Sequence, residues 1–179
     1  MRRLNVVYHS YNSYSKIITN QSGPAQAMLY SLGLSQKDLK KPQIGIGTVW
    51  YESNPCNSHL SSISNKVKDN FKNKNLLGFK FNSIGVSDGI SMGTTGMQYS
   101  LLSRELIADS FETICRAHHY DGLISIPGCD KNLPGVLISM VRLNRPSFII
   151  YGGAMRPNYY KNQELDIVSA FESYGKLLK

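Results

Sequence analysis

The chain has 179 residues, of which 41% are hydrophobic, and it carries a formal net charge of +8. This length suits one domain with a core of its own, and the hydrophobic fraction excludes a disordered chain. No apolar run approaches the roughly 20 residues that a membrane helix needs, so we expect a soluble chain with no membrane partner. The three cysteines are an odd number without the spacing of a disulfide framework, which favours a reducing compartment.

The basic charge could indicate a nucleic-acid partner. The lysines of the middle region, however, are spread among asparagines and do not form one cluster; they are Lys66, Lys68, Lys72, Lys74 and Lys80. This pattern is typical of the solvated face of a helix and its exit loop. We therefore expect no nucleic-acid partner.

Residues 1–12 are predicted to be a disordered leader or the remnant of a targeting segment. Arg2 and Arg3 are followed by serine, tyrosine and asparagine, and no acidic residue precedes Asp38. Transit peptides share this richness in arginine and serine and this lack of acids. Two arginines are few for such a peptide, so both interpretations stay open.

The rest of the chain alternates between helical and strand patterns. The first predicted helix, 25–32, stops at a glycine, and a buried strand, 43–50, follows Pro42. The clearest helix is 100–118, because its apolar residues share one face and its acids lie elsewhere. The other predicted elements are helices 58–71, 134–143 and 165–178 and strands 79–86, 123–127 and 147–151. This alternation predicts an α/β fold, a parallel sheet with helices on both faces.

Two glycine-rich stretches do not indicate a nucleotide site. Gly45-Ile46-Gly47 lacks the third glycine and the helix start of a dinucleotide-binding fingerprint. The loop GISMGTTG (89–96) lacks the Gly-Lys-Ser/Thr ending of a phosphate-binding loop.

Three predicted strands end in loops of unusual chemistry. These loops are SNPCN (53–57), SDG (87–89) and GCDKN (128–132). In open parallel sheets the ligand crevice lies outside the carboxyl ends of the strands. We therefore expect the three loops to converge.

The loops hold a thiol pair and a carboxylate pair. Cys56 lies in a polar turn, where a structural cysteine would be out of place, and Cys129 is close to a lysine that could favour its thiolate. Asp88 and Asp130 follow strands expected to be neighbours and would suit magnesium, although Asp-Gly is more often a turn. Two thiols are too few for a closed metal site, so further ligands must come from elsewhere.

The third cysteine and three histidines are expected to play no part in this site. Cys115 lies on the apolar face of helix 100–118, where a structural role is expected. His59, His118 and His119 have no partner at metal-ligand spacing, and we interpret them as capping or surface residues.

Taken together, these residues resemble the dihydroxy-acid dehydratases, within a wider family that includes sugar-acid and phosphogluconate dehydratases. GVSDGISMGT is similar to the dihydroxy-acid branch, and the cysteine of NPCN is similar to the members with a 2Fe–2S cluster. The resemblance runs from about Ser13 to the C-terminus. The matching stretches, in the family's order, are SNPCNSHL (53–60), FNSIGVSDGISMGTTGMQYSLLSRELIADSFET (81–113), HYDGLISIPGCDKNLPGVL (119–137), RLNRPSFIIYGG (142–153) and LDIVSAFESYG (165–175).

By position, the resemblance implies the roles of five residues. Cys56 and Cys129 correspond to thiolate ligands of the 2Fe–2S cluster. Asp88 and Asp130 correspond to Mg²⁺ ligands, and Lys131 to a lysine that is carbamylated and bridges to the Mg²⁺, which makes it the catalytic candidate. A carbamate would turn a repelled ammonium into an anionic oxygen ligand. We expect Cys129 to face the cluster and Asp130 and Lys131 the Mg²⁺, because neighbours along an extended chain point to opposite sides.

The resemblance implies a hydro-lyase that converts 2,3-dihydroxy carboxylates, such as 2,3-dihydroxyisovalerate, to 2-keto acids in valine and isoleucine biosynthesis. Mg²⁺ would acidify the substrate C–H, and a cluster iron would act as a Lewis acid without net redox change. The full-length enzyme is expected to be a homodimer. A eukaryotic member is expected in mitochondria or plastids and a bacterial one in the cytoplasm.

Residues 13–179 would then form an N-terminal cluster- and magnesium-binding α/β domain that is truncated. The family's third cluster cysteine, a further magnesium-binding glutamate and a serine base lie in later segments, including a C-terminal domain. We therefore expect no catalysis from this chain alone. Two alternatives stay open: a non-catalytic remnant that binds a metal or a partner, and a sugar-acid dehydratase of the same family.

Overall fold

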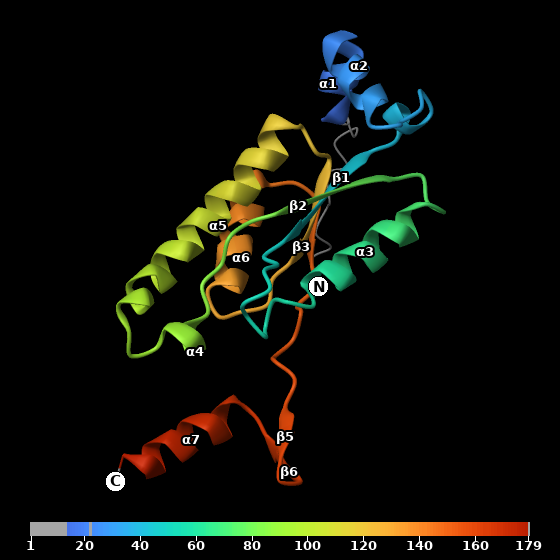
Figure 1. The fold of residues 1–179 in the computed structure, drawn as a ribbon. Helices are drawn as coiled ribbons and strands as arrows, with labels where there is room; N and C mark the ends of the chain where they lie inside the picture. Colours follow the sequence, from blue (N-terminus) through green and yellow to red (C-terminus); the bar gives the residue numbers. More distant parts are fainter. Residues whose placement is uncertain (1–13, 22, 179) are drawn as a thin grey trace, which may run out of the picture.

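The computed structural model describes residues 14–21 and 23–178, so the predicted leader, residues 1–12, lies outside the described part of the chain. Its centre is a parallel sheet with the strand order β2 (Leu77–Asn82), β1 (Gln43–Thr48), β3 (Gly122–Ile126) and β4 (Ser147–Ile149). Figure 1 shows one face of this sheet covered by α3 (Leu60–Phe71) and the other by α5 (Gln98–Ala117) and α6 (Asn132–Leu143). The predicted α/β fold with helices on both faces is confirmed.

Shorter elements flank this unit. Before the sheet come α1 (Ser15–Gln21), α2 (Gly23–Ser31) and the 3-10 turn η1 (Asp38–Lys40). The loop predicted after β2 holds two short turns of helix, α4 (Asp88–Ser91) and η2 (Thr95–Met97). After the sheet come β5 (Asn158–Tyr160), β6 (Gln163–Leu165) and α7 (Ile167–Leu177). Within the described residues, no helix combines the length and the apolar character needed to cross a membrane.

The face of the sheet under α3 buries one apolar cluster. Ile46 of β1, Ile126 of β3 and Leu60 of α3 are fully buried there. Further along α3, Ile63, Val67 and Phe71 pack against the same cluster. These residues recur at helical spacing, so one stripe of α3 supplies the contact while its lysines face solvent.

Aromatic rings fill the other face and stand over two glycines of β1. Phe111 of α5 packs edge-on against Phe81 of β2, with ring centroids 5.0 Å apart. A Cβ on Gly47 would overlap both rings, and a Cβ on Gly45 would come within 2.8 Å of Tyr120. The Gly-Ile-Gly of β1 therefore has a packing role, which agrees with its exclusion as a nucleotide-binding motif.

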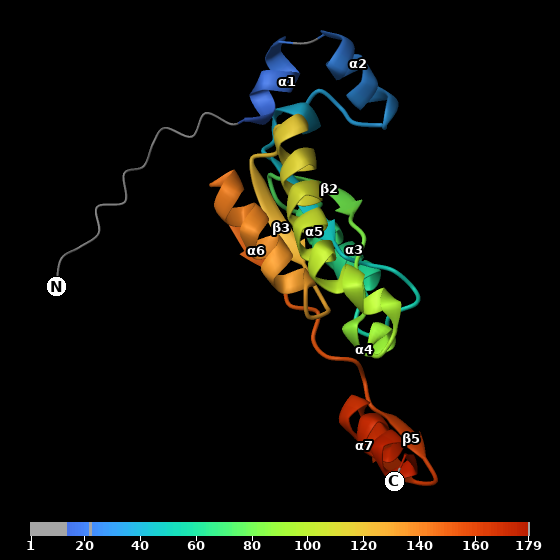
Figure 2. The same ribbon diagram turned by 90° about the vertical axis from the view of Figure 1, so that its left-hand side faces the viewer.

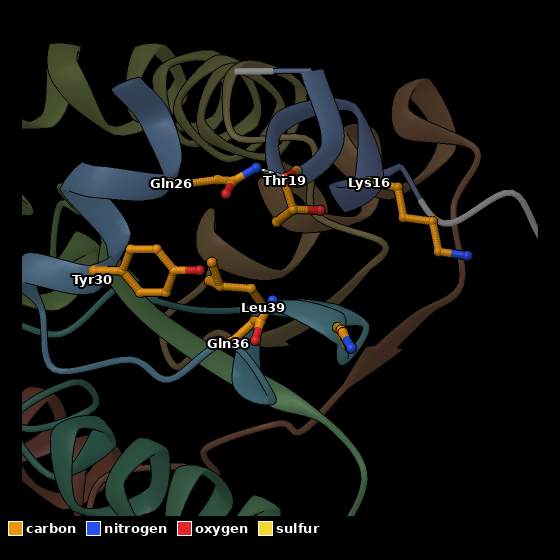
Figure 3. Close-up of a pocket in the computed structure, with 7 residues that line it drawn as sticks. Lys16, Thr19, Gln26, Tyr30, Gln36 and Leu39 are labelled. Carbon is orange, nitrogen blue, oxygen red and sulfur yellow. Dashed lines mark hydrogen bonds between the residues drawn. The ribbon is translucent and has the colours of Figure 1, made fainter. Parts of the chain in front are cut away.

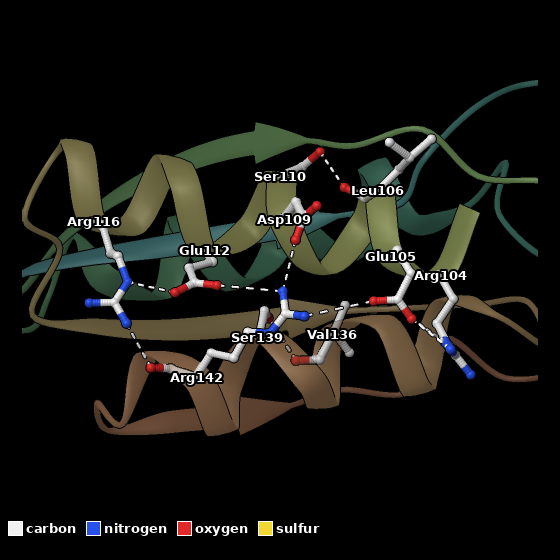
Figure 4. Close-up of polar contacts among 10 residues, drawn as sticks. All are labelled: Arg104, Glu105, Leu106, Asp109, Ser110, Glu112, Arg116, Val136, Ser139 and Arg142. Atoms are coloured by element: carbon white, nitrogen blue, oxygen red, sulfur yellow. Dashed lines mark hydrogen bonds and ion pairs between the residues drawn. The ribbon is translucent and has the colours of Figure 1, made fainter. Parts of the chain in front are cut away.

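α6 lies against α5, and a polar network runs along one side of that contact (Figure 4). Gly135 permits the close approach, because a Cβ there would come within 2.9 Å of the Arg104 carbonyl oxygen. Arg142 of α6 reaches three acids of α5: Asp109 at 2.8 Å, Glu112 at 3.6 Å and Glu105 at 3.7 Å. Ion pairs as exposed as these contribute little each, so apolar packing holds the two helices together.

Asp121, just before β3, ties the N-terminal helices to the sheet. Its buried carboxylate accepts hydrogen bonds from the backbone N–H of Ser15 at 3.2 Å and of Gln43 at 2.7 Å. The Arg145 guanidinium lies 4.2 Å from the ring centroid of Tyr14 and adds a cation–π contact. These contacts hold α1 and α2 near the amino ends of the strands (Figure 2).

The C-terminal segment projects from the opposite end of the sheet (Figure 2). Its two antiparallel strands are joined by Lys161 and Asn162, whose φ angles of 48° and 63° are both positive, as a two-residue hairpin requires. Asp166 caps α7 by accepting a hydrogen bond from the Ser169 N–H at 2.8 Å. The predicted helix 165–178 is confirmed, and its apolar side chains, such as Phe171, are exposed.

The buried thiol and phenol of the aromatic face predict a loss of stability at alkaline pH. Burial raises the pKa of Cys115 from 9.0 to about 12. Burial, with a smaller contribution from Cys115, raises the pKa of Tyr120 from 10.0 to about 12. Because both groups ionise earlier in the unfolded chain, their contribution to stability is complete below about pH 9 and is lost as the pH rises to about 12.

Urea unfolding at about pH 8 and about pH 11 measures this loss. We expect the free energy of unfolding to fall between these pH values, and to fall less in Cys115→Ala, which lacks one of the two groups. Equal falls in the two proteins would contradict the assignment to Cys115. Cys129→Ala is the matched control, because its thiol is partly exposed.

Candidate functional site

The three loops predicted to converge meet at the carboxyl ends of β1, β2 and β3. Gly128, after β3, lies against the turn after β1, since a Cβ there would overlap the carbonyl oxygen of Cys56. Lys131, in the same loop, reaches Asp88 in the loop after β2. The two acids do not follow neighbouring strands as predicted, because β1 lies between β2 and β3. Asp88 and Asp130 approach each other across the end of β1.

Cys56 and Cys129 are neighbours, and both are partly exposed. Burial raises the pKa of Cys56, and the charge and thiol hydrogen bond of Cys129 raise it further. The backbone N–H of Met155 donates to the Cys56 sulfur and opposes that rise. A protonated thiol must lose its proton to bind a metal, so this pair would release protons on metal binding.

Lys131 joins the two carboxylates. Its Nζ donates to Asp88 Oδ2 at 3.0 Å and also to Asp130 Oδ2. The Asp130 side chain is 64% exposed and that of Asp88 only 15%, so the pair runs from solvent into the protein. The buried Ser100 of α5 donates its hydroxyl to Asp88 Oδ1 at 2.6 Å. Both oxygens of Asp88 therefore have fixed partners.

The charges of this cluster favour a cation between the acids. Burial by itself raises the pKa of Asp88, but hydrogen bonds from Ser100 and Lys131 outweigh it, and the pKa is lowered. Hydrogen bonds to Asp130 and Asp88 raise the pKa of Lys131. Two carboxylates thus converge on one positive centre, and carboxylate oxygens are among the ligands that Mg²⁺ takes. The carboxylate oxygens of this cluster suit Mg²⁺, whereas the raised pKa of Lys131 favours its ammonium and a carbamate forms only on a neutral amine.

Tyr51 is a half-buried phenol close enough to the thiol pair and to Asp88 for their charges to affect it. Its hydroxyl oxygen accepts a hydrogen bond from Asn54 Nδ2 at 2.8 Å. Burial raises the pKa of Tyr51; the Asn54 hydrogen bond opposes this, and the negative charges of Cys129, Cys56 and Asp88 add to it. The phenol is therefore within electrostatic reach of both pairs.

The segment from Cys129 to Lys131 is a turn. The Asn132 N–H donates to the Cys129 carbonyl at 3.0 Å, and Lys131 has helical backbone angles, φ −83° and ψ −11°. The prediction that neighbours along an extended chain separate the two pairs is therefore wrong. The turn nevertheless directs Cys129 toward Cys56 and Lys131 toward Asp88.

The remaining residues considered from the sequence lie outside this cluster. Cys115 is buried between α5 and the sheet, at 1% exposure, which confirms its structural role. His59 shares a hydrogen bond of 2.7 Å with the Gly152 carbonyl, and His118 is the exposed C-cap of α5. None of these histidines lies with the thiols or the carboxylates.

Sequence reasoning missed Ser100, Tyr51 and three buried asparagines that surround the site. Ser100 could have been noticed as a polar residue close to the apolar face of α5. Asn54 and Asn57 lie in a turn and Asn132 at the start of α6, positions where the sequence cannot distinguish a buried amide from a turn or cap residue. Within 14–21 and 23–178, moreover, no group of three or more histidine, cysteine or acidic side chains is placed to hold a metal ion. The thiols and the carboxylates are therefore two separate pairs.

A cavity of about 620 Å³ lies elsewhere, among α1, α2 and η1 (Figure 3). Its polar lining consists of Lys16, Thr19, Gln26, Tyr30, Gln36 and Lys40. These elements lie near the amino ends of the strands, so the cavity is separate from the cluster described above (Figure 1).

Most of this chain is similar in sequence to known proteins. The family model described as "Dihydroxy-acid/6-phosphogluconate dehydratase N-terminal" matches residues 41–179. A dihydroxy-acid dehydratase of Francisella tularensis subsp. novicida is 57% identical over 169 residues, which cover 93% of this chain and 30% of that protein. A mitochondrial dihydroxy-acid dehydratase of Schizosaccharomyces pombe is 55% identical over 98% of this chain and 30% of that protein. A chloroplastic dihydroxy-acid dehydratase of Arabidopsis thaliana is 56% identical over 93% of this chain and 28% of that protein.

The matched region contains the whole candidate site. Cys56, Asp88 and the loop 128–132 all lie within residues 41–179. The chain spans about 30% of the length of the bacterial and fission-yeast relatives. Because the family model covers most of the chain, the chain belongs to the dihydroxy-acid/6-phosphogluconate dehydratase family and contains its N-terminal domain.

Proposed function

We propose that this chain forms the cluster- and magnesium-binding part of a dihydroxy-acid dehydratase, which removes water from 2,3-dihydroxy carboxylates to give 2-keto acids. The observation that carries the proposal is the convergence at one edge of the sheet of the thiol pair with the ion-paired Asp88, Asp130 and Lys131. Relatives named dihydroxy-acid dehydratases, at 55–57% identity, support this activity. The substrate class includes 2,3-dihydroxyisovalerate, an intermediate of valine biosynthesis.

The thiol pair and the carboxylate pair suit two different groups. Thiolates are the ligands of iron–sulfur clusters, so Cys56 and Cys129 would hold a 2Fe–2S cluster. Carboxylate and carbamate oxygens suit Mg²⁺, which Asp88, Asp130 and carbamylated Lys131 would hold. When bound, these groups supply the Lewis acidity that acidifies the substrate C–H and assists the departure of hydroxide.

The chain's own residues orient this chemistry. Ser100 donates a hydrogen bond to Asp88 Oδ1. The other oxygen, Asp88 Oδ2, is therefore directed at Lys131 Nζ. Tyr51 uses its oxygen to accept from Asn54, so its hydroxyl hydrogen stays available to a substrate oxygen between the two pairs. The homodimer, the lack of a nucleic-acid partner and the compartment stay predictions; eukaryotic relatives are named mitochondrial or chloroplastic.

A chimera tests the proposed activity and the role of Lys131. This chain would replace the matching segment of the Francisella relative, which supplies the remaining residues. We expect the chimera to release 2-keto acid from 2,3-dihydroxyisovalerate. Lys131→Arg should lower kcat by about 10²-fold or more, because arginine keeps the charge but cannot become a carbamate ligand. Activity on gluconate alone would instead assign the sugar-acid branch, and full activity in Lys131→Arg would exclude the carbamate.

The same chimera tests the thiol ligands. After anaerobic reconstitution with iron and sulfide, we expect the visible absorption of a 2Fe–2S cluster. In Cys56→Ser we expect this absorption to be about tenfold weaker, because a serine oxygen is a harder ligand than a thiolate and suits the cluster less well. Cys115→Ala, whose thiol is buried elsewhere, is the matched control and should keep it. A spectrum that survives in Cys56→Ser would overturn the ligand assignment.

Ser100 is expected to control magnesium affinity through Asp88. Ser100→Ala removes the hydrogen bond to Asp88 Oδ1, and loss of such a supporting contact typically weakens metal binding by about 10–100-fold. The Mg²⁺ concentration at half-maximal turnover should rise accordingly. Ser110→Ala on the same helix is the matched control, because that hydroxyl bonds only to the Leu106 carbonyl (Figure 4). Equal shifts in the two variants would argue against a metal at Asp88.

A further inference from the structure

Three buried asparagines form a continuous chain of hydrogen bonds between the two cysteine turns. Asn54 Nδ2 donates to Asn57 Oδ1 at 2.9 Å, and Asn57 Nδ2 donates to Asn132 Oδ1 at 2.8 Å. All three residues are 0% exposed. We call this chain the asparagine relay; it joins the turn after β1 to the start of α6.

Each end of the relay holds the backbone of one cysteine. Asn54 Oδ1 accepts from the Cys56 N–H at 3.1 Å. At the other end, Asn132 Oδ1 accepts from the Cys129 N–H at 2.8 Å. The relay therefore fixes the main chain at both thiols and connects the two through side chains alone.

The central hydrogen bond of the relay joins two loops and stabilises neither of them by itself. Asn54 and Asn132 make contacts within their own turns, which such residues commonly do in any protein. The bond from Asn57 to Asn132 instead crosses between loops 75 residues apart in the sequence. Asn57 Nδ2 also donates to the Val49 carbonyl at the end of β1. Asn57 thus fixes the Cys129 turn against both the Cys56 turn and the sheet.

Burying three amides is costly unless their donors and acceptors are hydrogen-bonded, and here each is bonded except Asn132 Nδ2, which has no partner among the described residues. Apolar side chains would fill the same volume without needing hydrogen-bond partners, but their contacts would not fix the orientation of one turn against the other. Amides carry a donor and an acceptor on one short side chain, so a chain of them transmits position in a fixed geometry. The contact of Gly128 with the Cys56 carbonyl limits the separation of the two turns from the other side.

We propose that the asparagine relay sets the separation of the Cys56 and Cys129 thiols for a shared metal centre, with Asn57 as its central positioning residue. The proposal rests on the proposed function only in assigning both thiols to one centre. The relay acts through the backbone of the cysteines and does not touch the metal. Tyr51 accepts from Asn54 and so adds one hydrogen bond to the relay.

The test compares the same substitution at two bonded neighbours. Asn57→Asp loses the amide donor that reaches Asn132 and Val49. Asn132→Asp keeps the oxygen that accepts from Cys129 and loses only an Nδ2 that has no partner among the described residues. Both variants bury one carboxylate at nearly the same place, so the added charge is matched and the loss of the Asn57 donor distinguishes them. Asn70→Asp, on the exposed side of α3, is the surface control.

The readout is capture of the two thiols by phenylarsine oxide in the metal-free full chain. The arsenic forms one bond to each sulfur and releases water, so tight capture requires two thiols at a fixed short distance. Cys115→Ala in every protein leaves Cys56 and Cys129 as the only thiols. Far-UV circular dichroism checks that each variant is folded.

We expect Asn57→Asp to weaken capture by about tenfold or more, which corresponds to about 1.4 kcal/mol, the scale of a lost buried hydrogen bond. Asn132→Asp and Asn70→Asp should stay within about twofold of the parent. Equal capture by Asn57→Asp and Asn132→Asp overturns the proposal. If Asn57→Asp does not fold, Asn54→Asp, which loses the donors to Asn57 and Tyr51, replaces it with the same expectation and the same overturning result.

Cluster uptake in the chimera separates this proposal from the proposed function. Weak capture by Asn57→Asp together with no cluster in the parent supports the relay and rejects the cluster. Equal capture in all variants together with a cluster in the parent rejects the relay and retains the cluster.

Discussion

The parallel pairing of β1 with a strand on each side is the constraint on which the site depends. β1 runs parallel to β2 and to β3, so all three strands end at the same edge. The turn after β1 supplies a thiol, the loop after β2 an acid, and the loop after β3 one more of each with a lysine. An antiparallel strand in any of these places would send its loop to the other end of the sheet. Strand direction therefore brings the thiol pair and the carboxylate pair to the same end of the sheet.

The sequence predicted the order and type of the main elements, because apolar periodicity reports which face of each is buried. It misplaced the second strand, 79–86, which ends at Asn82. There the Asn82 side chain accepts from the Trp50 N–H at 2.8 Å and from the Thr48 hydroxyl at 2.7 Å. These bonds replace the backbone ladder, so the apolar residues Ile84 and Val86 continue as a loop. The alternating apolar pattern of a strand does not show where a side chain, here that of Asn82, takes the hydrogen bonds that would continue the strand.

The site residues could be predicted by type, whereas their supports could not. Thiols, acids and a lysine at strand ends are unusual enough to attract attention in a sequence. The hydroxyl of Ser100 and the buried amides belong to residue types that are common in any loop or helix, and their roles depend on partners far along the chain. The hairpin β5–β6 was missed for a related reason, since Lys161 and Asn162 adopt positive φ without the glycine that usually signals such a turn.

The wide separation of the two thiols along the chain has a consequence for assembly. Joining the Cys56 and Cys129 turns closes a loop of about the 75 residues that separate Asn57 from Asn132, and such closure costs entropy that only the finished sheet repays. During synthesis, Cys56 leaves the ribosome long before β3 exists to pair with β1. Until then the turn that carries Cys56 lacks its neighbour, the loop after β3. The end of the sheet that carries both thiols is thus completed only when β3 pairs with β1.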